Sequence, residues 1–272
     1  MTSDVAAISE RIVITVTRRR VFRDVFELSL VAFAFLLYFL VRGSVVDRAG
    51  EAFGNANEII RLEKDLGIFW EPRLQELILG NKALIQLWNA VYFWLDFPVI
   101  IIIGLWLYFW HRHEYTVARD AILISGAIAL IIYNLYPVAP PRLTSGFDFV
   151  GTVEEYSNFS YQAQSMQAFV NPYAAVPSLH YGWSVLVGGA LLWTARHWLL
   201  RGFGLVLPFA QLASIVLTAN HFILDAPAGL AVGLAGLLLA MALQRWGYAW
   251  LRREVEQRFT GRAAREGIKQ RA

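Results

Sequence analysis

The chain has 272 residues, of which 57% are hydrophobic and 14% aromatic, and its formal net charge is only +3. Water-soluble domains contain about 45–50% apolar residues, so the excess indicates a membrane protein, and the small net charge does not suggest a nucleic-acid partner. The absence of cysteine excludes disulfides, thiolate metal sites and cysteine nucleophiles.

Apolar residues are gathered into long runs that can cross a bilayer, which requires about 20 mostly apolar residues per helix. We therefore predict an all-α fold, a polytopic bundle of about six transmembrane helices. Residues 27–246 would form the membrane domain, between a basic N-terminus (1–26) and a basic tail (247–272), both cytoplasmic. The predicted spans are Glu27–Val41, Leu87–Trp110, Val117–Tyr136, Tyr181–Leu200, Gly202–Ala219 and Phe222–Trp246.

The distribution of Lys and Arg predicts the orientation, because these residues favour cytoplasmic loops. With six spans and the N-terminus inside, the inside segments carry more than twice as many Lys and Arg residues as the outside segments. We expect a multi-pass protein of the cell membrane whose two long loops, 43–86 and 137–180, are extracytoplasmic.

Each long loop has its own character. In the first, apolar residues recur three or four apart, Gly67 suits a helix stop and Pro72 suits the next helix start, which predicts two short helices. They would lie on the membrane surface or pack against the spans. The second is rich in aromatic residues between 147 and 173, and we interpret that stretch as a candidate lid.

Two motifs at span ends carry candidate phosphate ligands. Pro140 and Pro141 hold the backbone before Arg142, whose guanidinium would then be a rigid clamp for a phosphate. Ser178 suits the N-cap of the fourth span, where free N–H groups attract anions, and His180 follows in the first turn. Each motif alone also fits a simpler interpretation, an interfacial side chain beside a helix end.

A third motif pairs a histidine with an aspartate at the start of the sixth span. His221 and Asp225 are four residues apart and would share a face if both were helical. An aspartate on one imidazole nitrogen fixes the tautomer and leaves the other nitrogen nucleophilic. A metal could use the same pair, but few further ligands are available.

The predicted topology places all three motifs on one face of the membrane. One arginine, two histidines and one aspartate at one face are the groups needed for phosphoryl transfer through a histidine intermediate. One histidine would attack phosphorus and the other would protonate the leaving oxygen. A non-catalytic scaffold or transporter stays open as an alternative, although transporters tend to show mid-span polar groups and inverted repeats, and neither is evident.

The spacing of these motifs resembles a known family. PSLH at 177–180, followed by HFILD at 221–225, is similar to the type 2 phosphatidic acid phosphatase superfamily. APPRL at 139–143, with LEKDLGIFWEPRLQ and NAVYFWLDFP, resembles its inositol phosphorylceramide synthase (inositolphosphotransferase) branch. The resemblance covers about residues 61–229.

The resemblance implies a role for each candidate residue. His221 would be the nucleophile that takes the phosphoryl group, with Asp225 as its orienting partner. His180 would protonate the leaving group, while Arg142 and Ser178 bind phosphate. The family needs no metal, and we expect no other cofactor.

Departures from the family pattern bear on the reaction. Leu135 stands where the phosphatases have a lysine, Leu179 replaces a glycine, and Ser214 precedes Ile215 rather than an arginine. Loss of two cationic ligands is typical of the transferase-like branch. The expected substrate is a phospholipid or polyprenyl phosphate, whose phosphoryl or phospho-headgroup passes to water or to a hydroxyl acceptor such as a polyol. A polyprenyl or phosphatidate phosphatase is the alternative enzyme.

Overall fold

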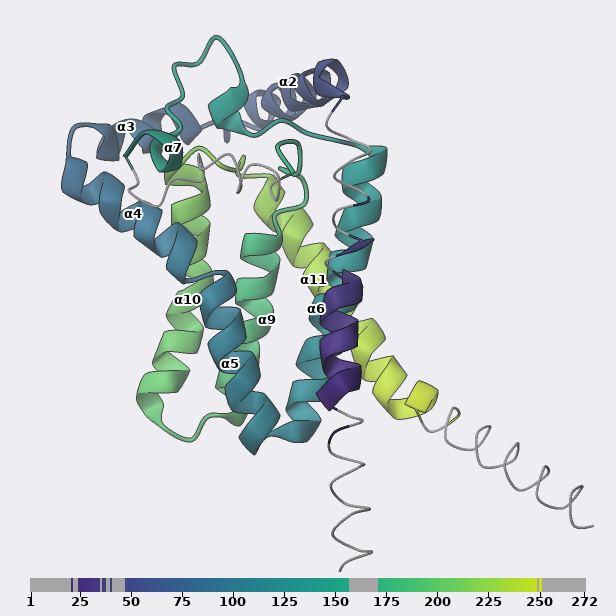
Figure 1. Cartoon of the computed structure of the whole chain (residues 1–272). Helices are drawn as coiled ribbons and strands as arrows, with labels where there is room; N and C mark the ends of the chain where they lie inside the picture. The colour runs from purple at the N-terminus through teal and green to yellow at the C-terminus, as the bar shows by residue number, and fades with distance from the viewer. Residues whose placement is uncertain are drawn as a thin grey trace, which may run out of the picture.

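The chain is all-α in a computed structural model that describes residues 21, 24–34, 36–37, 40, 47–156, 171–248 and 250. Several helices run roughly side by side in one half of the molecule, and α2, α3 and α7 gather at one end of them (Figure 1). The elements are α2 (Ala49–Asp65), α3 (Glu71–Leu79), α4 (Lys82–Trp94), α5 (Phe97–Trp110), α6 (Arg112–Leu135), η1 (Pro141–Leu143), α7 (Thr152–Tyr156), α9 (Leu179–Thr194), α10 (Trp198–Leu217), α11 (Asp225–Ala242) and the π-helical η2 (Leu243–Gly247).

Four stretches of the described chain are long and apolar enough to cross a membrane. They are α4 with α5, α6, α10, and α11 with η2. The predicted count of six is not confirmed, because α9 has only 16 residues and the first predicted span lies partly outside the described residues. The predicted basic ends fall largely outside the described residues, as do residues 157–170 of the candidate lid.

The predicted second span is not one straight helix. It breaks between α4 and α5 at Leu95 and Asp96, and Pro98 lies in the first turn of α5. Proline cannot donate its backbone nitrogen and is tolerated where a helix begins. The break places a carboxylate inside an otherwise apolar run.

The predicted boundary between the fourth and fifth spans was wrong by several residues. α9 ends at Thr194 and α10 begins at Trp198, so the last residues assigned to the fourth span belong to α10. His197 caps α10, its ring accepting a hydrogen bond from the backbone nitrogen of Leu199 at 3.3 Å. Apolar residues continue on both sides of this short turn and concealed it.

The two helices predicted in the first outer loop are present as α2 and α3. Gly67 between them has φ +71°, a conformation that favours glycine, and Pro72 lies in the first turn of α3. Ala56 and Ile60 of α2 are buried in a cluster that also contains Phe222. One face of α2 therefore packs onto the loops at this end of the bundle, which neither of our two alternatives named.

Glycines allow the helices around α9 to approach closely. A Cβ at Gly229 of α11 would lie 2.0 Å from the carbonyl oxygen of Ser178, and one at Gly182 would lie 2.4 Å from the carbonyl of Gly229. Gly188 and Gly204 make a similar contact between α9 and α10. Small residues at such crossings are typical of membrane bundles, where packing replaces the hydrophobic effect between helices.

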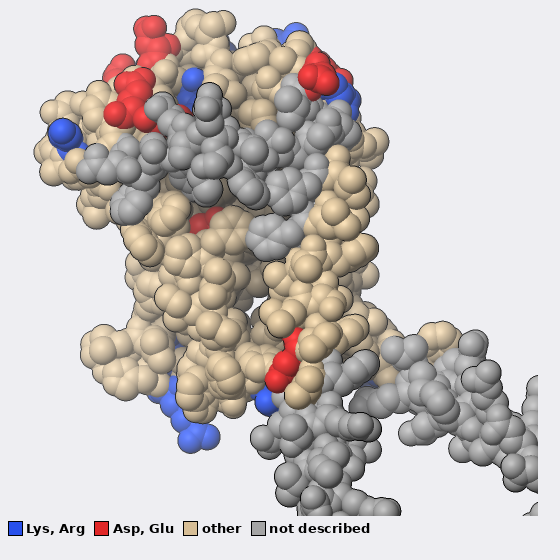
Figure 2. All heavy atoms as spheres, in the orientation of Figure 1, with Lys and Arg blue, Asp and Glu red and all other residues tan. Residues whose placement is uncertain are grey.

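Charge is distributed as expected for a protein that crosses a bilayer. Figure 2 shows Lys, Arg, Asp and Glu near the two ends of the molecule and an almost uncharged belt between them. Many large apolar side chains on α5, α10 and α11 are exposed, among them Ile102, Phe209 and Leu238. These side chains would face lipid.

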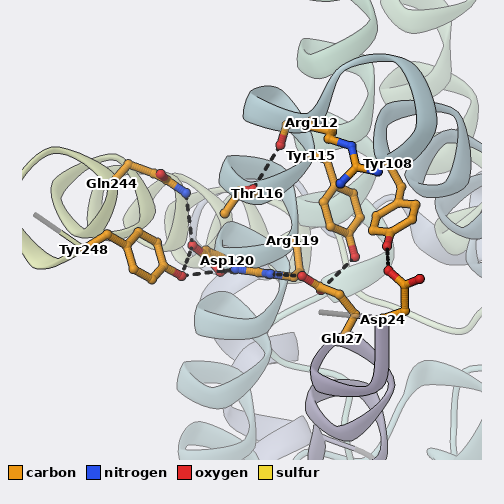
Figure 3. Close-up of polar contacts among 10 residues, drawn as sticks. All are labelled: Asp24, Glu27, Tyr108, Arg112, Tyr115, Thr116, Arg119, Asp120, Gln244 and Tyr248. Carbon is orange, nitrogen blue, oxygen red and sulfur yellow. Dashed lines mark hydrogen bonds and ion pairs between the residues drawn. The ribbon is translucent and has the colours of Figure 1, made fainter. Parts of the chain in front are cut away.

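Polar contacts connect the helices at the end of the bundle that lies away from α2 and α3 (Figure 1 and Figure 3). Asp120, a buried carboxylate in α6, accepts hydrogen bonds from Arg119 at 2.7 Å and from the Tyr248 hydroxyl at 2.9 Å. Tyr115 donates to Glu27 of the N-terminal helical segment at 3.0 Å. Charges inside a membrane bundle are costly unless paired, and these pairs join α6 to both terminal segments.

Candidate active site

The turn between α10 and α11 carries the first histidine. α10 ends at Leu217, with Thr218 as its C-cap, and Ala219 takes a φ of +54°, which is uncommon for a residue with a side chain. The backbone nitrogens of Asn220 and His221 both donate to the carbonyl of Ile215 at 3.0 Å. These bonds satisfy a carbonyl group at the end of α10 and reverse the chain direction, and His221 is buried at this turn.

His221 is oriented by two acceptors. Its Nδ1 lies 2.8 Å from the carbonyl oxygen of Ala175 and 3.1 Å from Oδ2 of Asp225. Since the carbonyl of Ala175 can only accept, Nδ1 carries the proton and Nε2 keeps its lone pair. The two residues do not share a helix: α11 begins at Asp225, and the turn before it, in which Phe222 N donates to Asp225 Oδ2 at 2.8 Å, brings them together.

His180 lies directly opposite. Its Nδ1 is 3.4 Å from Nε2 of His221, and its Nε2 is 3.3 Å from Oδ2 of Asp96. The ring also stacks on Tyr92, with centroids 4.6 Å apart. Two histidines thus stand between two aspartates, in the order Asp225, His221, His180, Asp96.

Asp96 belongs to none of the three motifs and was not predicted, although its position in the sequence is unusual. It is a buried acid within the apolar run Leu87–Trp110. Ionisable residues inside spans are costly and tend to be functional. That rule alone singles out Asp96. Its pairing with His180, in contrast, follows only from the packing of α5 and α9.

Ser178 caps α9, as predicted. Its hydroxyl oxygen accepts from Tyr181 N at 3.4 Å, and its own backbone nitrogen donates to the carbonyl of Asp225 at 3.0 Å. The side chain is fully buried. Ser178 therefore ties the start of α9 to the start of α11 and holds the two histidine-bearing segments in register.

Arg142 lies in η1 and is held from two sides. Its backbone nitrogen donates to the carbonyl of Ala219 at 3.0 Å, and its Nε donates to Glu154 at 2.7 Å. The sequence predicted a rigidly held clamp, and the contact with Glu154 was not anticipated. The two terminal nitrogens of the guanidinium have no hydrogen-bond partner in the described part of the chain, so the group that would meet a phosphate is oriented but still open.

The environment keeps His221 neutral. The pKa of His221 is lowered to about 3, chiefly by burial and to a smaller extent by the positive charge of Arg142, while the hydrogen bond to Ala175 acts in the opposite direction. A nucleophilic imidazole must be unprotonated, and here it is so at neutral pH. In the described segments, no group of three or more His, Asp or Glu side chains is arranged to hold a metal ion.

The structure thus brings together four of the five residues singled out from the sequence through direct contacts, and places Arg142 on the adjoining turn. A family model described as the PAP2 superfamily matches residues 57–239, which include all five. Neither a curated protein nor a solved structure matches the chain.

Proposed function

Because this chain belongs to the PAP2 superfamily, we propose that it is a membrane-embedded lipid phosphotransferase or phosphatase that works through a phosphohistidine. The observation that carries the proposal is the facing pair of imidazoles. His221 has an unprotonated Nε2 and an oriented Nδ1. Nδ1 of His180 lies 3.4 Å from that Nε2, and Asp96 lies beside the other nitrogen of His180.

In the first half-reaction, Nε2 of His221 attacks phosphorus and the bond from phosphorus to the leaving oxygen breaks. His180 donates its Nδ1 proton to that oxygen, while Asp225 stabilises the positive charge that develops on His221. Arg142 holds the non-bridging oxygens. In-line attack puts nucleophile and leaving oxygen on opposite sides of phosphorus, so the two rings must separate as substrate enters.

In the second half-reaction, His180 takes a proton from a hydroxyl, whose oxygen attacks phosphorus and releases His221. Water gives hydrolysis, and a polyol or second lipid gives transfer. Burial lowers the pKa of His180, and the charge of Asp96, whose Oδ2 lies 3.3 Å from Nε2 of His180, raises it. Asp96 therefore favours the protonated form that the first half-reaction needs. We expect Asp96→Leu to impair the release of the leaving group more than the binding of substrate.

The transferase-like branch is the more specific part of the proposal. The position where the phosphatase pattern has its second arginine is Ile215, which is fully buried in an apolar cluster beside the His221 turn. One cationic ligand, Arg142, suits a phosphodiester better than a doubly charged phosphate monoester. The inositolphosphotransferase-like assignment rests on this argument and on the APPRL segment; a polyprenyl or phosphatidate phosphatase is the second candidate.

The test uses protein purified in detergent with EDTA present. Phospholipids and a polyprenyl phosphate are incubated with and without inositol or glycerol, and products are followed by mass spectrometry. His221→Ala is the inactive variant, and His113→Ala, an exposed histidine near the other end of α6, is the control. A product that depends on His221 and on the polyol supports transfer. If no lipid turns over, the non-catalytic scaffold or transporter interpretation takes its place.

A further inference from the structure

The turn that joins His221 to Asp225 is held by carboxyl groups from outside the bundle. The backbone nitrogen of Ile223 donates to Glu71 Oε1 at 2.9 Å, and that of Leu224 donates to Glu63 Oε1 at 2.8 Å. These two amides directly precede α11, where a helix has no internal acceptors for its N–H groups. The two glutamates supply the missing acceptors.

Glu63 and Glu71 come from different helices and meet under the surface. Glu63 is near the end of α2 and Glu71 begins α3, and both side chains are fully buried. They lie within hydrogen-bonding reach of each other, and Oε2 of each has no other partner in the part of the chain that the structure describes. Two buried carboxylates cannot both stay charged in contact, so the pair shares a proton.

The surroundings strongly favour the protonated form of this pair. Burial and the hydrogen bond with Glu71 raise the pKa of Glu63 to about 9, and the backbone bond from Leu224 lowers it only in part. The other charged groups that act on Glu63 are Glu71 itself and Asp225 of α11, and both are acids. The pair therefore holds its proton throughout the neutral range.

From this geometry we propose that Glu63 and Glu71 are a proton-sharing pair of positioning residues, through which α2 and α3 hold the His221–Asp225 turn in its reactive geometry. The inference rests on the proposed function and deepens it. Neither glutamate reaches the histidine rings: each acts through a backbone amide two or three residues beyond His221. By occupying these amides, the carboxyls also keep the start of α11 from competing with Arg142 for phosphate.

The kinetic test compares Glu63→Gln and Glu63→Leu with the parent on a lipid that the parent turns over. A carboxamide keeps an oxygen for Leu224 and offers an N–H to Glu71 in place of the shared proton, so kcat should stay close to the parent value. Leucine removes the acceptor from a buried amide, and kcat should fall about 10- to 100-fold with KM nearly unchanged. Glu76→Leu, at an exposed position of α3, is the matched control and should change neither.

A stability test needs no activity. The unfolded chain releases this proton near pH 4.5 and the folded chain keeps it up to about 9, so rising pH favours unfolding across that window. The Tm of the parent should therefore fall more steeply between pH 5 and 9 than that of Glu63→Gln. Equal slopes of Tm against pH in the parent and in Glu63→Gln would show that the pair shares no proton. An unchanged kcat in Glu63→Leu would refute the positioning role. An inactive parent with unequal slopes would instead refute the proposed function, and with it the role in catalysis.

Discussion

Replacing Asp225 by asparagine tests how the nucleophile is oriented. In Ser-His-Asp enzymes the corresponding change costs about 10⁴-fold, because the wrong tautomer is held. Here the carbonyl of Ala175, 2.8 Å from Nδ1, still accepts the proton of His221 and preserves the tautomer. The substitution replaces a charged hydrogen-bond acceptor by a neutral one. A hydrogen bond to a charged group is worth about 1.5–3 kcal/mol, so we expect kcat to fall about 10- to 150-fold.

The assay is lipid turnover at saturating substrate, with thermal unfolding measured in parallel. The amide oxygen of the introduced asparagine can still accept from Phe222 N, as Asp225 Oδ2 does at 2.8 Å. The NH₂ of that side chain would occupy the place of Asp225 Oδ1, which is buried without a partner among the described residues, at a stability cost of about 1–3 kcal/mol. A loss as large as that of His221→Ala would refute the role given to Ala175, and no loss would remove Asp225 from the mechanism.

Three further predictions concern the phosphate clamp, the helix crossing and the orientation. Arg142→Lys should lower kcat/KM about 10²-fold in the lipid assay, because an ammonium cannot keep the bond to Glu154 and also clamp two phosphate oxygens. Gly229→Ala should destabilise the fold by about 1–3 kcal/mol and reduce activity, since its Cβ would meet the backbone at the start of α9. Gly189→Ala, whose Cβ meets nothing within 4 Å, should do neither in the same thermal-unfolding and turnover assays. Because the chain has no cysteine, Gly80→Cys should react with a membrane-impermeant maleimide in intact cells, and His113→Cys only after permeabilisation.

Residues of the candidate site could be predicted where a side chain with suitable chemistry stands at the end of a predicted span. A histidine or arginine at the end of an apolar run is unusual, and His180, His221 and Arg142 stood out for that reason. The N-cap role of Ser178 followed from its place before α9. The pairing of His221 with Asp225 was expected for the wrong reason, because a turn and not a shared helix joins them.

The partners of these residues could not be predicted in the same way. Glu63 and Glu71 lie on amphipathic helices, where an acid ordinarily faces solvent, and only the packing of α2 and α3 onto the turn before α11 buries them. Glu154 lies in the short helix α7 of the second long loop and belongs to none of the motifs. The turn before Trp198 was also hidden, because hydropathy does not distinguish a helix end from its continuation.

The most direct test of the central claim is to trap the phosphorylated enzyme. Protein mixed briefly with a lipid carrying a labelled phosphate, then quenched in alkali, is digested and the labelled peptide is sequenced. The account predicts an alkali-stable, acid-labile label on His221, absent in His221→Ala and accumulating when the acceptor is withheld. Lipid turnover without such a label, or a label on another residue, would contradict it.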